Sequence, residues 1–181
     1  MTAILTADLK NKSDLQKGIN LGILVNEAYV LRGVQVGGLN CAEKSSYGMQ
    51  VGGFNGAEES IGVQVGLGNI PEESIGVQVG LLLNETGKSK GVQVGLGNIT
   101  KESNYGVQVG LVNGAEESRG AQAGLVNIVV KELKGLQVGG ICYAGEGDYF
   151  QLGVLTLRNG ERPWYAKFSP LIGYSKSKKK E

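Results

Sequence analysis

Residues 62–69 read Gly-Val-Gln-Val-Gly-Leu-Gly-Asn, and close copies of this stretch recur along the chain. Val63, Val65 and Leu67 occupy every second position, and glycine or glutamine fills the positions between them. Alternation with a period of two is typical of a β-strand. The stretch therefore predicts a strand of about seven residues that ends at Asn69.

Small, polar residues follow each copy of the strand, as in residues 113–118, Asn-Gly-Ala-Glu-Glu-Ser. Such residues favour turns, so each unit is expected to combine a strand with a return of similar length. Regular repetition at so short a period indicates stacked units that bury a core only together with their neighbours. The units are 14 or 15 residues apart and begin at Gly18, Gly33, Gly48, Gly62, Gly76, Gly91, Gly106, Gly120, Gly135 and Tyr149.

The repeat predicts an all-β fold, a parallel β-solenoid of about ten rungs with capped ends. Ten rungs spaced by about 4.8 Å would form a rod roughly 48 Å long. Because apolar side chains usually fill protein interiors, we expect the valines and leucines to point inward and the glycines and glutamines to form a flat outer face. The expected interior residues are Val34, Val36, Val63, Val65, Val77, Val79, Val92, Val94, Val107, Val109, Leu67, Leu96, Leu111 and Leu125.

Parallel stacking of like units also brings like residues into columns. Amide side chains stacked about 4.8 Å apart can hydrogen-bond along the axis, which predicts a Gln ladder and an Asn ladder. A third column of serines is expected at the turns. The predicted Gln ladder is Asn20, Gln35, Gln50, Gln64, Gln78, Gln93, Gln108, Gln122, Gln137 and Gln151; the Asn ladder is Asn40, Asn55, Asn69, Asn84, Asn98, Asn113 and Asn127; the Ser column is Ser45, Ser60, Ser74, Ser89, Ser103 and Ser118.

The sequence divides into four expected segments: an N-terminal cap at residues 1–17, the solenoid repeats at 18–157, a C-terminal cap at 158–174, and a disordered lysine-rich tail at 175–181. Caps are expected because the ends of a solenoid expose unpaired strand edges. Two rungs carry an extra residue before the asparagine, at residues 23–26 and 81–84, and we expect a β-bulge to absorb each insertion.

The formal net charge is +1, so no overall field attracts nucleic acid, and a nucleic-acid partner is not expected. Residues 1–17 lack the apolar core of a secretory signal, and no run approaches the roughly 18 apolar residues of a membrane-spanning helix. These features predict a cytoplasmic protein without a membrane partner.

The chain has no histidine, which removes the commonest general base and metal ligand. The paired glutamates Glu58, Glu59, Glu72 and Glu73 stack on adjacent rungs and suggest either a hard-cation site or, as we favour, a solvated turn balanced by lysines. Cys41 and Cys142 lie too many rungs apart for a disulfide. We therefore predict a protein that is not an enzyme, with no catalytic residue, metal or cofactor.

The units at residues 106–113 and 120–127 resemble the Gly-Leu-Gln-x-Gly-Leu-x-Asn repeats of a bacterial surface-repeat protein family. Residues 169–174, Ser-Pro-Leu-Ile-Gly-Tyr, are similar to the ending of such repeats, so the resemblance covers about residues 18–174. It implies a surface-associated protein and brings no catalytic residues.

These observations favour a non-enzymatic structural or interaction protein that uses its flat Gly/Gln face for self-association or partner docking, as a homo-oligomer or with another protein. The alternative is a membrane-inserted antiparallel β-barrel or pore. On the first hypothesis, charges introduced at Gln78 and Gln93 should abolish association. The candidate binding residues are Gln35, Gln50, Gln64, Gln78, Gln93, Gln108, Gln122 and Gln137.

Overall fold

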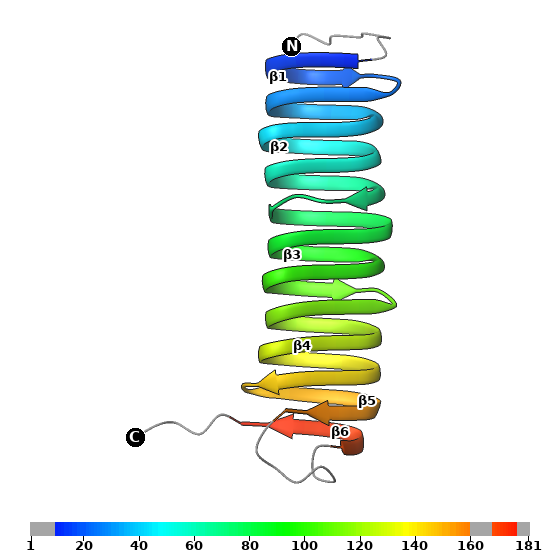
Figure 1. Cartoon of the computed structure of the whole chain (residues 1–181), viewed down its shortest axis with the longest axis vertical. Coiled ribbons are helices and arrows are strands. Elements are labelled where there is room, and N and C mark those ends of the chain that lie inside the picture. The colour runs from blue at the N-terminus through cyan, green and yellow to red at the C-terminus, as the bar shows by residue number, and fades with distance from the viewer. Residues whose placement is uncertain (1–9, 160–167, 177–181) are drawn as a thin grey trace, which may run out of the picture.

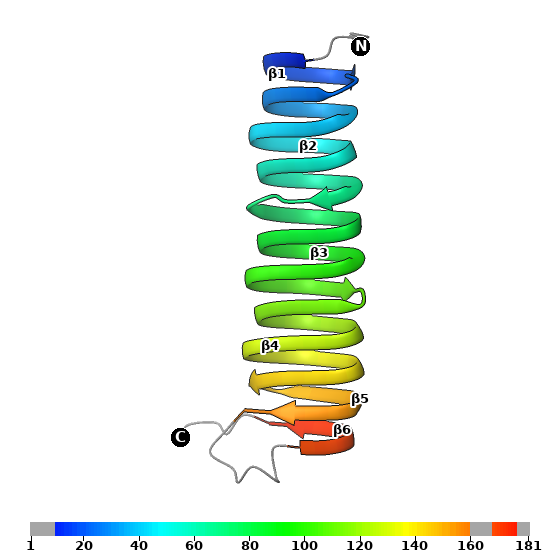
Figure 2. The same cartoon turned by 45° about the vertical axis from the view of Figure 1, so that its right-hand side comes forward.

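The computed structural model describes residues 10–159 and 168–176, and in this part of the chain all regular structure is β. The polypeptide winds as one continuous coil whose turns stack along the long axis (Figures 1 and 2). The predicted parallel β-solenoid is confirmed. The strands are β1 (Lys10–Leu21), β2 (Val25–Asn69), β3 (Glu73–Val109), β4 (Val112–Glu146), β5 (Tyr149–Arg158) and β6 (Phe168–Ser175), and β2, β3 and β4 each span more than one turn of the coil.

Successive turns pair in parallel with a step of one repeat unit. Gly62 lies beside Gly76, and Gly106 lies beside Gly120. All pairings from β1 to β5 are parallel, and only β5 with β6 is antiparallel. An antiparallel barrel needs neighbouring strands of opposite direction, so that alternative is wrong.

The extra residues of the longer units lie either at a shift in the strand pairing or at a break between two strands. The strand pairing shifts between Gly66 and Gly68, opposite the insertion at residues 81–83, so the expected bulge is present there. The insertion at residues 23–26 falls at the break between β1 and β2. A further shift lies between Thr100 and Ser103, on the return side of a rung.

That shift changes the predicted Ser column. Asn104, not Ser103, pairs with Ser118, and Asn104 is the buried residue of the two. The prediction that placed Ser103 in this column was wrong because it did not locate the extra residue of the unit on the return side.

The two ends of the rod differ. β1 already begins at Lys10, and Lys17 pairs with Arg32, so residues 10–17 belong to the first rung rather than to the expected cap. At the other end, β6 lies antiparallel on β5 with Gly173 beside Gln151. Residues 1–9 of the expected N-terminal cap, residues 160–167 of the expected C-terminal cap and residues 177–181 of the expected tail lie outside the described residues.

The side chains point opposite to the prediction. The nine ladder glutamines from Gln35 to Gln151 are at most 1% exposed, whereas Val36, Val77, Val79, Val94, Val107 and Val109 are 36–41% exposed. Moving a strand by one residue exchanges its two faces, and the alternation alone does not say which face is inside. Glutamine can occupy the interior because each amide finds its hydrogen-bonding partner in the rungs above and below.

Candidate interaction surface

The Gln ladder runs through the interior of the rod. Each glutamine donates from Nε2 to Oε1 of the glutamine one rung earlier, over 2.7–3.1 Å, from Gln151 down to Gln35. Gln35 donates to Gln16, which takes the first place in the ladder that was predicted for Asn20. Among the described residues, Gln16 Nε2 and Gln151 Oε1 are the ladder atoms left without a hydrogen-bonding partner. The predicted ladder is real, but it is buried.

Contacts across the interior show that the rod is only about one side chain deep. Thr100 belongs to the return of its rung, and its hydroxyl lies 3.2 Å from Gln93 Oε1 and 3.2 Å from Gln108 Nε2. The strand and the return of each rung therefore face each other directly. Smaller residues complete the interior on the return side, including Ala42, Ala57, Ala115, Ser60, Ser74 and Ser118.

The Asn ladder is also present and runs in the opposite sense. Each asparagine from Asn26 to Asn113 donates from Nδ2 to Oδ1 of the next asparagine, over 2.8 Å. The same Nδ2 commonly donates to a backbone carbonyl of the next rung, as Asn98 does to Val109 over 2.9 Å, which fixes the orientation of the amide. Because the Gln amides point toward the N-terminus and the Asn amides toward the C-terminus, the dipoles of the two ladders oppose each other along the axis.

Cys142 replaces asparagine after Asn127. Asn127 Nδ2 lies 3.7 Å from Cys142 Sγ, and burial raises the pKa of this thiol. Cys41 is exposed and unbonded to another cysteine; its partial burial and the charges of Glu27 and Glu43 raise its pKa. Both cysteines are free thiols, and raised pKa values disfavour the reactive thiolate.

Two glycine columns let the rungs approach closely. The glycine that opens each strand has a positive φ, which is 138° at Gly91, and a Cβ added there would lie 2.0 Å from the carbonyl oxygen of Gly76. The glycine after the second valine leaves room for the Asn ladder, since a Cβ at Gly110 would lie 2.7 Å from Asn98 Nδ2. Both columns are therefore structural rather than ligand-binding.

With the glutamines inside, one side of the rod presents an uncharged surface. We call this side the apolar face and define it as the outward residues between the positive-φ glycine and the ladder asparagine of each rung. From the second rung to the ninth it holds Val34, Val36, Leu39, Met49, Val51, Phe54, Val63, Val65, Leu67, Val77, Val79, Leu81, Leu82, Val92, Val94, Leu96, Val107, Val109, Leu111, Val112, Ala121, Ala123, Leu125, Leu136, Val138 and Ile141. Many of these side chains are exposed, and Leu81 and Leu125 exceed 60%.

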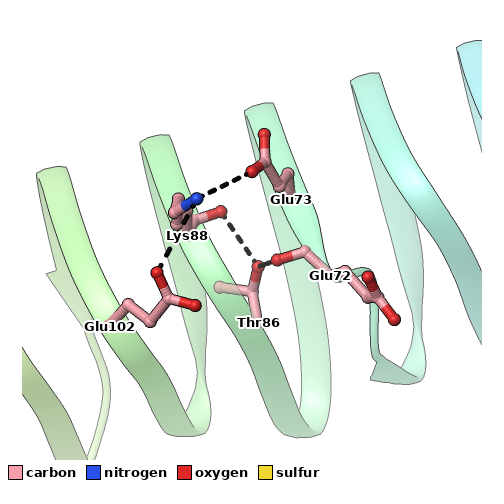
Figure 3. A network of polar contacts seen from close by, with 5 residues as sticks. All are labelled: Glu72, Glu73, Thr86, Lys88 and Glu102. Atoms are coloured by element: carbon pink, nitrogen blue, oxygen red, sulfur yellow. Dashed lines mark hydrogen bonds and ion pairs between the residues drawn. The ribbon is translucent and has the colours of Figure 1, made fainter.

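The other side of the rod, which we call the charged face, carries glutamates and lysines with scattered isoleucine and tyrosine. Lys88 Nζ lies 3.1 Å from Glu73 Oε1 and 3.7 Å from Glu102 Oε2, so it bridges the rungs on either side (Figure 3). The hydrogen bond to Glu73, followed by the charges of Glu73 and Glu102, raises the pKa of Lys88. These groups are solvent-exposed, so the ion pairs contribute little to stability.

A shallow hollow of about 580 Å³ lies over this network, between residues 70–73, 85–88 and 101–102. Beneath it Thr86 is buried, and its hydroxyl lies within hydrogen-bonding distance of two carbonyl oxygens, 3.3 Å from that of Glu72 and 3.1 Å from that of Lys88 (Figure 3). Within the described ranges, no three His, Cys, Asp or Glu side chains come together closely enough to hold a metal ion. Of the glutamates around the hollow, Glu73 and Glu102 pair with Lys88, and Glu85 pairs with Lys101.

The glutamines predicted to bind a partner lie in the interior of the rod. Gln35, Gln50, Gln64, Gln78, Gln93, Gln108, Gln122 and Gln137 are all buried, so they cannot form a docking surface, and that assignment is corrected. Their neighbours, the valines predicted to be inside, lie on the outside of the rod instead. The alternation separated the two sides of the strand, but it did not show which side faces outward.

Comparison of the chain with protein-family models, curated proteins and solved structures found no match. In the described part of the chain, no helix is long and apolar enough to cross a membrane.

Proposed function

We propose that the protein is a structural repeat protein that acts as an interaction scaffold and docks a partner on its apolar face. The proposal is supported by an unusual arrangement, in which polar side chains lie inside the rod and apolar side chains lie outside. Buried amides fill the interior, and a row of exposed apolar side chains runs along one side of the rod. Contiguous exposed apolar surface of this kind marks interaction sites in soluble proteins.

The size of the apolar face supports the same role. Six residues of strand at about 3.3 Å each give a width of about 20 Å, and the eight rungs from the second to the ninth give a length of about 38 Å. The face therefore covers about 770 Å², which exceeds the few hundred Å² of the largest apolar patch on a typical monomer. The ladders in the interior keep successive rungs in register beneath this surface. The proposed docking role does not require a catalytic group.

The test is whether the apolar face is covered inside cells. Cysteines are introduced separately at Val94 and Ile99 of the full chain, with Cys41→Ser removing the exposed native thiol, and a membrane-permeant maleimide is added to expressing cells. Val94, on the apolar face, and Ile99, beside Thr100 on the charged face, are 39% and 41% exposed, so they form a matched pair. We expect Val94→Cys to be labelled at least about tenfold more slowly than Ile99→Cys, since a docked partner excludes the reagent.

Labelling of the same two variants after unfolding gives the intrinsic reactivity of each thiol. Equal rates in cells, after this correction, would show that the apolar face is bare and would contradict the proposed role.

A further inference from the structure

We propose that the partner on the apolar face is a second copy of this chain, packed face to face. The inference rests on the proposed function and adds the identity of the partner. It follows from the spacing of the face, its area, and the distribution of charge around it.

The spacing of the apolar face matches that of another such face. Its side chains form rows that repeat with the rung spacing of about 4.8 Å, and rows of one sheet interdigitate best with rows of the same period at a sheet separation of about 10 Å. A second copy presents that period along its whole length. Because Val77, Val79 and their equivalents are β-branched and have few rotamers, little side-chain entropy is lost when the rows interlock.

The area is sufficient for a stable pair. A standard protein interface buries about 800 Å² on each partner. The apolar face covers about 770 Å² by the dimensions given above, which is close to that figure. Two rods that overlap over the whole face would therefore bury about the area of a standard interface.

The charges limit the association to this one face. The outward positions of the apolar face carry no charged residue from Val34 to Ile141. On the edge beside the positive-φ glycines, Arg32 stacks over Tyr47 at 5.8 Å and Arg119 over Tyr105 at 5.3 Å, while Ile61 and Ile75 hold the same position on other rungs. Charged side chains therefore border part of the apolar face, as they do at the rim of an interface.

The charged face makes the assembly a closed one. The charged face carries glutamates and lysines that are exposed and pair across the rungs, as Lys88 does with Glu73 and Glu102, so covering this side would remove charged groups from water. A rod with one self-complementary side and one hydrated, charged side forms an isologous pair and stops, whereas two self-complementary sides would give an open stack. We therefore expect a dimer rather than a fibre.

The experiment measures the native mass of the purified full chain by sedimentation across a dilution series. The test variant carries Val79→Lys and Val109→Lys, which lie two rungs apart on the apolar face. The control carries Ile70→Lys and Ile99→Lys, which lie two rungs apart on the charged face and are exposed to a similar degree. We expect a dimer for the wild type and the control, and a dissociation constant at least about a hundredfold higher for the test variant, because each buried lysine would be unpaired.

Circular dichroism and thermal melting of both double variants establish that they fold. Crosslinking supplies an independent readout that needs no charge on the face: a short bismaleimide should join two copies through Val94→Cys and not through Ile99→Cys, with Cys41→Ser in both. Failure of Val94→Cys to crosslink would overturn the proposal even if a lysine variant misfolds.

Three other outcomes would overturn it. A monomeric wild type that still shows slow labelling of Val94→Cys in cells would leave the docking role standing with a different partner. A dimer broken by the control pair and not by the test pair would place the contact on the charged face. A monomer that binds vesicles of neutral phosphatidylcholine would make the occupant a lipid surface.

Discussion

Alanine in place of Gly91 is expected to destabilise the protein by at least about 3 kcal/mol, or to prevent folding altogether. Gly91 has a φ of 138°, a conformation that residues with a Cβ rarely adopt, and its Cβ would lie 2.0 Å from the Gly76 carbonyl oxygen. This oxygen belongs to the backbone of the neighbouring rung, so it cannot move without separating the stack. The effect is measured as the change in the free energy of unfolding in urea.

Gly114→Ala is the matched control. No atom lies within 4 Å of the Cβ that it would add, and its φ is not positive. The free energy of unfolding should change by no more than about 0.5 kcal/mol, with a small gain expected from the restricted unfolded chain. Equal losses for both substitutions would show that the effect comes from glycine content in general and not from close approach of the rungs.

Glutamate in place of Gln93 is expected to cost about 3–5 kcal/mol at neutral pH. The substitution keeps the shape of the side chain but removes the donor that Gln93 presents to Gln78 Oε1 over 2.8 Å. It places a carboxylate against a carbonyl oxygen in the interior, where Gln93 is about 1% exposed. If glutamine faced the solvent, as the sequence suggested, the same change would have almost no effect on stability.

The loss should depend on pH in a defined direction. Burial raises the pKa of the introduced carboxyl in the folded state above its value of about 4.3 in the unfolded chain. Below that value both states are protonated, and the carboxyl can donate to Gln78 as the amide does, so the variant should approach the wild type. As pH rises toward the folded-state pKa the difference in stability should grow, and above it the difference should become constant.

The measurement is the difference between variant and wild type in the free energy of unfolding, taken at a series of pH values. A difference that does not change with pH would contradict a buried, ionisable ladder position.

The two kinds of charge substitution distinguish the two sides of one strand. Gln93→Glu should lower stability, whereas Val79→Lys with Val109→Lys should leave the fold intact and weaken association. The expectation from the sequence was that charges at Gln78 and Gln93 would affect association. Because these glutamines are buried, the expected result is instead a loss of stability.

Much of the architecture could be predicted because the repeat specifies it. The step between Gly62 and Gly76 gives the rung length, the period-two alternation gives the strand, and the recurrence of glutamine and asparagine gives both ladders. Parallel stacking of like units then places each column in register. None of these inferences requires knowledge of which side is inside.

The direction of the side chains could not be obtained from hydrophobicity, since the interior is about one side chain deep and its amides are satisfied along the stack. A different signal in the sequence was informative. The valine positions vary among rungs, with Met49, Ala121 and Phe150 in place of valine, whereas glutamine recurs in nine successive units. A residue that bonds to two neighbours tolerates little variation, and an outward residue tolerates more, so this contrast identifies glutamine as the interior column.

The most direct test of the account is hydrogen exchange of the side-chain amides, followed by nuclear magnetic resonance on the ¹⁵N-labelled protein in D₂O. A polar interior predicts that the NH₂ signals of Gln64 to Gln137 and of Asn40 to Asn113 persist, with protection approaching that of the backbone amides in the same rungs. Exchange of the glutamine side chains at the rate of an unfolded peptide, with the backbone amides still protected, would place them on the surface and contradict the account.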